Sequence, residues 1–176
     1  PTAITLHSDA SGANAYTLIG GSVSTDYSED ITITLDYTDL NKIKTTAIGV
    51  NQGSTYLSIT NLAAKDTATA PDAQVSTANL VTAIDASSPK QVDTQGYLPD
   101  EQAPKLTAFK LDMHAGSITF TFDEAVNAGQ FTPGEFALQK EAADDTVKVV
   151  LAVKVAPTTN DDEITVDLTD AVLNDI

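Results

Sequence analysis

An internal repeat constrains this chain more than any other feature of its sequence. Residues 1–43 resemble residues 133–176, so the second copy begins 132 positions after the first. With one extra residue placed near Glu163, apolar positions match in order, and both copies close on Leu-Asn-x-Ile. A period of this length suits one domain plus a linker, which argues against a solenoid. The aligned pairs include Pro1/Pro133, Leu6/Leu138, Val23/Val155, Ile31/Ile164, Ile33/Val166 and Leu35/Leu168. We expect the last three pairs to be buried at equivalent places in the two copies.

The two copies have different flanking segments. No counterpart of residues 106–132 precedes the first copy, and no counterpart of residues 44–84 follows the second. The sequence starts at Pro1 with no signal peptide, so we expect it to be processed or cut from a longer chain. The expected organisation is residues 1–85 as the C-terminal part of one repeat, 86–104 as a linker, and 105–176 as the N-terminal part of the next repeat.

Strand signals dominate the chain. Apolar and polar residues alternate at 31–37, 106–113 and 117–123, as a half-buried strand requires. His114-Ala115-Gly116 predicts a tight hairpin turn between the last two runs. Residues 86–104 contain three prolines and almost no apolar alternation, which favours an extended, polar segment. Many short strands separated by Gly, Asn and Asp predict an all-β fold of the β-sandwich type.

Helical signals are brief. Residues 38–43 predict a single turn of helix capped by Thr38 or Asp39, with a twin at residues 169–176. The aromatic share is only 6 %, without Trp, so the cores must consist mainly of Val, Ile, Leu and Ala.

The charge balance excludes several classes of partner. The chain has 25 Asp and Glu residues against nine Lys and no Arg, which gives a net charge of −16. Such a surface repels nucleic acid and anionic lipid. No apolar run is long enough to span a membrane. The acidic excess has two explanations, which are solubility and the gathering of divalent cations. Cysteine is absent, which excludes disulfides, thiolate zinc sites and cysteine nucleophiles.

The run LTAFKLDMHAGSITFTFDEAV at residues 106–126 resembles the opening hairpin of a family of tandem Ig-like repeats. These cadherin-like and adhesin-like β-sandwich repeats occur in very large surface proteins of algae, other protists and bacteria. YTLIGGSVSTDYSEDITITL, LNKIK and STYLSIT resemble later elements of the same family. His114 departs from it, because such repeats more often have a small polar or acidic residue there. The resemblance implies an Ig-like sandwich and a location outside the cell or at its surface.

No set of residues predicts catalysis. His7 and His114 are the only histidines, and both are expected to be surface polar residues. Tandem Ig-like domains often hold Ca²⁺ at their joints. Because Ca²⁺ needs six to eight oxygen ligands, the linker pair Asp100 and Glu101 would need help, for example from Asp123 and Glu124 at the end of a strand. These four carboxylates are the candidate metal ligands, and no other cofactor is expected.

The leading functional hypothesis is structural. A sandwich that lacks strands exposes apolar surface and unpaired edges, so neighbouring chain should fill each gap. That chain is either a covalent continuation or another copy in a head-to-tail array, as in an extracellular filament, flagellar hair, sheath or adhesin stalk. The alternative is a carbohydrate- or protein-binding module of a cell-surface protein, for which Tyr27, Tyr37 and Tyr97 are the stacking candidates.

Overall fold

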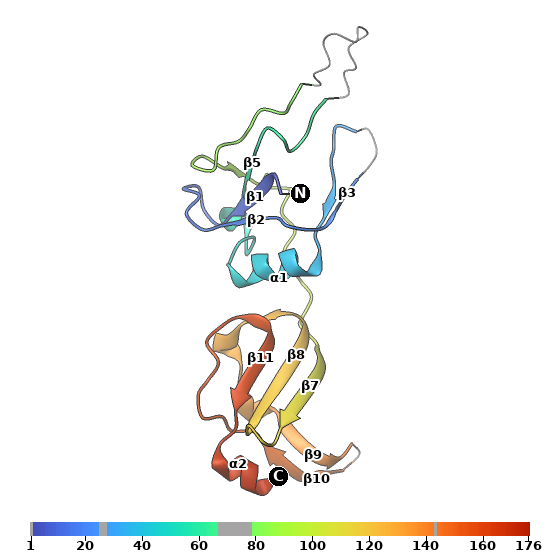
Figure 1. Cartoon of the computed structure of the whole chain (residues 1–176), viewed down its shortest axis with the longest axis vertical. Coiled ribbons are helices and arrows are strands. Elements are labelled where there is room, and N and C mark those ends of the chain that lie inside the picture. The colour runs from blue at the N-terminus through green and yellow to red at the C-terminus, as the bar shows by residue number, and fades with distance from the viewer. Residues whose placement is uncertain (1, 25–27, 67–78, 143) are drawn as a thin grey trace. The chain divides into compact units, whose positions relative to one another are not determined.

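The computed structural model describes residues 2–24, 28–66, 79–142 and 144–176. The chain divides into two compact units, Pro1–Glu101 (unit 1) and Gln102–Ile176 (unit 2). In both units the regular secondary structure is mainly antiparallel strand, and the described part of each contains one α-helix (Figure 1). The expectation of a β-rich fold is confirmed at this level.

Unit 1 contains a four-stranded antiparallel sheet. Strand β1 is central, because it pairs with β2 on one edge and with β5 on the other. Strand β6 continues the sheet beyond β5. Two further short strands, β3 and β4, form a separate antiparallel pair. The bounds are β1 Ile4–His7, β2 Ala15–Thr17, β3 Ser22–Val23, β4 Ile33–Thr34, β5 Tyr56–Ile59 and β6 Lys90–Gln91.

Helix α1 (Tyr37–Thr45) follows β4 and begins at a cap supplied by Asp36. The Asp36 carboxylate accepts a hydrogen bond from the Asp39 backbone N–H at 2.8 Å, which satisfies one of the free N–H groups of the first turn. The expected cap at Thr38 or Asp39 is therefore wrong. The described core of unit 1 is small and comprises Leu18, Ile43 and Ile48, with Ile4, Leu6, Tyr16, Ile33 and Leu35 packed against it.

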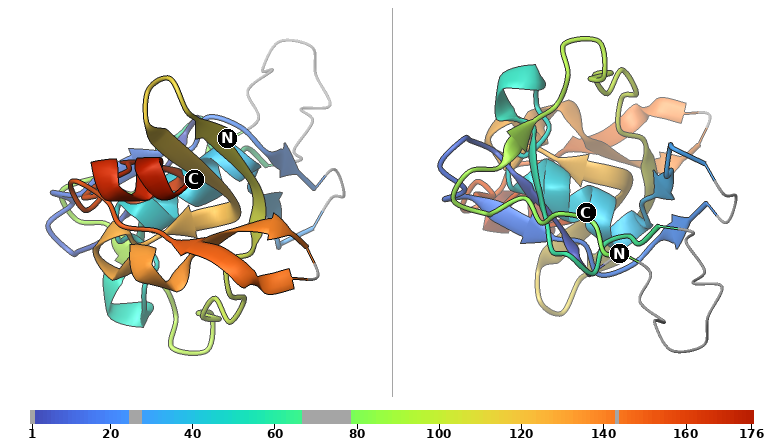
Figure 2. Two further views of the ribbon diagram at one scale, coloured as in Figure 1. Left: turned by 90° about the horizontal axis from the view of Figure 1, so that it is seen from below. Right: turned by 90° about the horizontal axis from the view of Figure 1, so that it is seen from above.

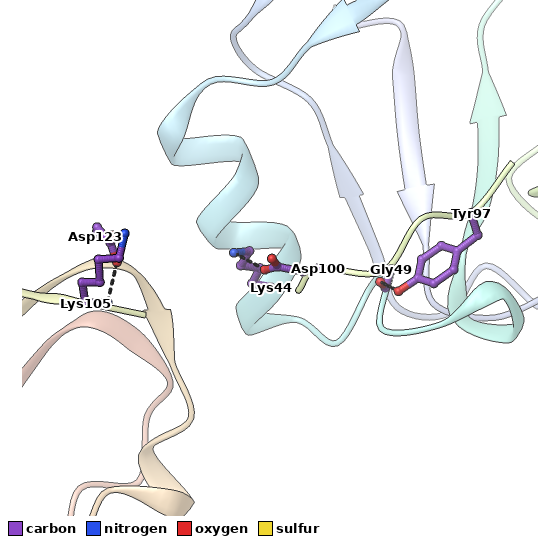
Figure 3. Close-up of polar contacts among 6 residues, drawn as sticks. All are labelled: Lys44, Gly49, Tyr97, Asp100, Lys105 and Asp123. Atoms are coloured by element: carbon purple, nitrogen blue, oxygen red, sulfur yellow. Dashed lines mark hydrogen bonds and ion pairs between the residues drawn. The ribbon is translucent and has the colours of Figure 1, made fainter. Parts of the chain in front are cut away.

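Much of the segment expected as a linker packs on unit 1. Residues 90–91 form β6, and Pro89 is buried. The Tyr97 hydroxyl donates a hydrogen bond to the Gly49 carbonyl at 2.7 Å, and Asp100 forms an ion pair with Lys44 at 2.6 Å (Figure 3). The chain therefore stays attached to unit 1 as far as residue 100.

Unit 2 is organised around the hairpin of β7 (Leu106–Asp112) and β8 (Ser117–Val126), which confirms the predicted hairpin. Gly116 takes a positive φ of 71° in the turn, and its N–H donates to the Asp112 carbonyl at 2.8 Å. Strand β11 (Asp161–Asp167) pairs with the other edge of β8, which gives the strand order β11-β8-β7.

A second hairpin, β9 (Ala137–Glu141) with β10 (Asp144–Val150), shares one core with this sheet (Figure 2). Helix α2 (Asp170–Asp175) follows β11. Three phenylalanine rings gather in the core, with the Phe120 centroid 4.6 Å from that of Phe136. The buried members of the core are Ile118, Phe120, Ala128, Leu151, Ile164, Val166, Leu168 and Val172.

Candidate functional site: an open groove between repeated elements

The two copies of the repeat share a strand–helix junction. Helices α1 and α2 begin 133 positions apart. The residue before each helix is its cap, since Asp36 accepts from the Asp39 N–H and Thr169 accepts from the Val172 N–H at 3.4 Å. The repeat seen in the sequence is therefore present in the local structure of this junction.

The hairpins that precede the junctions are also equivalent. The Leu18 N–H donates to the Ile4 carbonyl at 3.0 Å, and the Leu151 N–H donates to the Phe136 carbonyl at 2.9 Å. Leu18 and Leu151 are both buried. The sequence alignment pairs Leu18 with Val150 instead. The structure places the extra residue of the second copy in hairpin β9–β10, where the register shifts, rather than in the strand that follows.

The strand leading into each helix has a different environment in the two units. In unit 2, Ile164 on β11 lies opposite Phe120 on β8 and is 3 % exposed. The equivalent Ile31 in unit 1 is 54 % exposed. Strand β4 follows Ile31 and pairs with β3. The expectation that Ile31 and Ile164 are equally buried is wrong, because no described strand lies beside Ile31 as β8 lies beside Ile164.

An apolar groove of about 870 Å³ opens at this place in unit 1. Its walls come from β1, from β5 and the chain after it, and from residues 29–35. Ile33 and Leu35 line the groove and are half-buried, whereas their equivalents Val166 and Leu168 are fully buried in unit 2. The groove therefore occupies the position at which unit 2 has the inward side chains of β8.

Unit 2 has a smaller groove of about 360 Å³, lined by residues of β7, β8 and β9. Phe109 on β7 lines it and is 58 % exposed. Strand β1 of unit 1 is paired on both edges, but its equivalent β9 pairs with β10 alone within the described residues. In their described parts, unit 1 thus lacks a counterpart of hairpin β7–β8, and unit 2 lacks a counterpart of β5.

A buried carboxylate joins one wall of the unit 1 groove to helix α1. Asp39 is fully buried and accepts a hydrogen bond from the Tyr16 hydroxyl at 2.8 Å. It also accepts from the backbone N–H groups of Ile19 at 3.1 Å and Gly20 at 3.0 Å. These bonds fix the chain directly after Leu18, which lines the groove.

The same contacts shift two pKa values. Burial acts to raise the pKa of Asp39, but the hydrogen bonds from Gly20, Tyr16 and Ile19 together outweigh it and lower that pKa below its ordinary value. Burial, followed by the hydrogen bond to Asp39, raises the pKa of Tyr16 to about 12. The charged Asp39 and the neutral Tyr16 are therefore the forms that suit the folded state.

His7 is not the surface residue that the sequence predicts. It is 1 % exposed, and its Nε2 lies 2.7 Å from the Ser58 hydroxyl, which ties β1 to β5. Its neighbour Ser58 is also buried, so this serine–histidine pair is closed to a substrate and is best explained as a structural contact. His114 is exposed in the β7–β8 turn.

The candidate metal ligands are Asp100 and Glu101 in unit 1, and Asp123 and Glu124 in unit 2. Asp100 is paired with Lys44, and the Asp123 carboxylate accepts a hydrogen bond from the Lys105 N–H at 2.7 Å (Figure 3). Within the described ranges, no three His, Cys, Asp or Glu side chains gather where they could hold a metal ion. The Ca²⁺ site therefore stays a prediction.

The candidate stacking residues have mixed positions. Tyr37 is 52 % exposed at the start of α1. Tyr97 is half-buried, with its hydroxyl bonded to Gly49. Tyr27 lies outside the described residues.

Among the described helices, none is long and apolar enough to cross a membrane. Comparisons of the chain with protein-family models, with curated proteins and with solved structures find no match.

Proposed function

We propose that this chain is part of an extracellular structural protein built from tandem Ig-like β-sandwich repeats. It joins head to tail with further repeats, as in a filament, flagellar hair, sheath or adhesin stalk. The observation that supports this most is that the repeated strand–helix junction has a different neighbour in each unit. In unit 2 the motif is covered by β8, whereas in unit 1 the same face is an open apolar groove.

The exposed apolar residues at these places favour assembly over a free-standing module. Ile31 is 54 % exposed in unit 1, and Phe109 is 58 % exposed in unit 2. Soluble proteins rarely leave apolar grooves of this kind beside an unpaired strand edge, because both invite association. The two-sheet core of unit 2 is compatible with a sandwich, and the net charge of −16 suits a surface that must stay soluble.

The alternative, a carbohydrate-binding module, has weaker support. Sugar binding generally uses exposed aromatic faces, and here the Tyr97 hydroxyl is already bonded to the Gly49 carbonyl. A glycan array tests this alternative directly, and specific binding that is lost in Tyr37→Ala would favour it over the structural role.

Immunogold electron microscopy tests the proposed function. Antibodies raised against the purified chain should label filaments, hairs or a sheath on intact, unpermeabilised cells of the source organism. Antibody pre-adsorbed with the chain is the control and should remove the label. Label confined to the cytoplasm of sectioned cells would contradict the proposal.

A further inference from the structure

The structure of unit 2 specifies what fills the groove of unit 1. We propose that this groove is a docking site for a β-hairpin of the β7–β8 type, which adds a strand beside residues 28–34. This inference rests on the proposed function and names the partner of the repeat. The occupant is a hairpin whose inward side chains follow the Ile-x-Phe-x-Phe alternation of residues 118–122.

The register of docking follows from the repeat. In unit 2, Ile164 lies opposite Phe120 and Val166 lies opposite Ile118. The equivalent residues of unit 1 are Ile31 and Ile33. Both line the groove, and Ile33 already pairs with β3 on its other edge. A donated strand can therefore bond to the edge of residues 28–34 that no described strand occupies and place its apolar side chains in the groove, which is strand addition to a sheet edge.

A hairpin from outside the chain fits better than the hairpin of a second copy. The β7–β8 hairpin is part of the unit 2 core, since Ile118 is 0 % and Phe120 is 3 % exposed. Donating it to another molecule would bury these two side chains again in the groove, but it would uncover the unit 2 core that they leave and expose Ile164 and Val166. The occupant is therefore a hairpin that has no unit 2 core of its own to leave.

The test adds such a hairpin at its natural spacing. Residues 105–132 are fused directly before Pro1 of the full chain, because residue 132 precedes Pro133, the equivalent of Pro1. Hydrogen–deuterium exchange then follows the amides of residues 29–35, with residues 162–168 of the same molecule as the reference. We expect exchange at 29–35 to slow at least about tenfold relative to the unfused chain.

A matched hairpin controls for chain length. The same fusion with Ile118→Asp and Phe120→Asp in the added copy alone keeps the length but loses the apolar face. It should leave residues 29–35 exchanging as in the unfused chain. Equal exchange with both hairpins, slow or fast, would overturn the proposal.

A groove variant locates the docking. Ile31 and Val50 are 54 % and 62 % exposed, so a lysine at either position should leave the unfused chain folded, as urea unfolding can verify. In the fused chain, Ile31→Lys should abolish the slow exchange and Val50→Lys, outside the groove lining, should retain it. Slow exchange that persists in Ile31→Lys would place the hairpin elsewhere and overturn the proposal.

The remaining outcomes separate the docking from the function. A dimer of the unfused chain in sedimentation, with residues 29–35 protected, would make a second copy the occupant and overturn the stated partner. Fast exchange in the fused chain together with labelled surface filaments would overturn the docking alone. Slow exchange together with cytoplasmic label would overturn the proposed function alone.

Discussion

The two units contain different kinds of aromatic residue. All five tyrosines of the chain lie in unit 1, and all five phenylalanines lie in unit 2. In unit 2, Phe120, Phe131 and Phe136 pack against one another in the core. In unit 1, Tyr16 and Tyr97 use their hydroxyls as hydrogen-bond donors. Apolar packing is thus the main contact of the repeated motif in unit 2, whereas polar contacts have a larger share in unit 1.

The contrast is sharpest at one pair of equivalent positions. Tyr16 and Asp39 form the buried hydrogen bond of unit 1. Their structural equivalents in unit 2, Val149 and Val172, both belong to the apolar core. Among the described residues, the unit 1 core has three buried apolar members and the unit 2 core has eight. Unit 1 therefore has a hydrogen-bonded carboxylate where unit 2 has the apolar pair Val149 and Val172.

The largest expected effect is on unit 2. Phe120→Ala should destabilise it by about 3–5 kcal/mol, because the substitution removes a ring that contacts two others and leaves a cavity. Hydrogen exchange of residues 106–126 in urea measures the loss. Phe109→Ala, at a side chain 58 % exposed, is the control and should change the stability by less than about 1 kcal/mol. A loss in Phe120→Ala as small as the one expected for Phe109→Ala would mean that packing of the Phe120 ring does not stabilise unit 2.

A smaller effect is expected at the polar centre of unit 1. Asp39→Ala should destabilise unit 1 by about 2–4 kcal/mol, because it leaves the buried N–H groups of Ile19 and Gly20 without their acceptor. Tyrosine fluorescence during urea unfolding reports this unit alone, since unit 2 contains no tyrosine. Asp30→Ala, at an exposed carboxylate, should leave the midpoint unchanged. A midpoint shift in Asp30→Ala as large as that in Asp39→Ala would contradict this assignment.

The pH dependence of unit 1 should differ from that of unit 2 on the alkaline side. The pKa of Tyr16 is raised from 10.0 to about 12, so folding favours the neutral phenol. Its contribution is complete below pH 10 and is lost as the pH rises through about 12. Circular dichroism during urea unfolding should show a steeper alkaline loss in the parent chain than in Tyr16→Phe. If the parent chain and Tyr16→Phe lose stability in parallel as the pH rises, ionisation of the Tyr16 phenol does not destabilise the folded state.

Local sequence predicted the β7–β8 hairpin correctly, although it placed the cap of helix α1 at Thr38 or Asp39 rather than at Asp36. The β7–β8 hairpin follows from period-2 alternation on both sides of a turn that contains Gly116, and it forms as expected. This hairpin depends on residues that are close together in the chain.

Features that depend on distant partners were missed. The burial of His7 follows from Ser58, 51 positions away, and the burial of Asp39 follows from donors about 20 positions away. The place of the extra residue in the second copy follows from the hydrogen bonds of Leu18 and Leu151 and from the register shift in hairpin β9–β10. Ile31 has the same alternating pattern as Ile164, but its exposure depends on a neighbouring strand rather than on its own sequence.

The smallest expected effect concerns the feature that the two units share. Asp36→Ala should destabilise unit 1 by about 1–2 kcal/mol, and Thr169→Ala should destabilise unit 2 by about 0.5–1 kcal/mol, because each removes a helix cap. The aspartate should matter more, because its bond is shorter, 2.8 Å against 3.4 Å, and because a carboxylate also interacts favourably with the positive end of the helix dipole.

Asp36→Ser and Thr169→Ser retain a side-chain acceptor and serve as matched controls, with most of each loss expected to be restored. Tyrosine fluorescence measures unit 1, and hydrogen exchange at residues 164–176 measures unit 2. If both alanine variants lose stability and both serine variants recover it, the strand–helix junction is stabilised in the same way in both copies. The difference between the units then arises from the strands that cover the junction. If either alanine variant is as stable as the parent chain, the junctions are not equivalent, and the register assigned to the docked hairpin loses its basis.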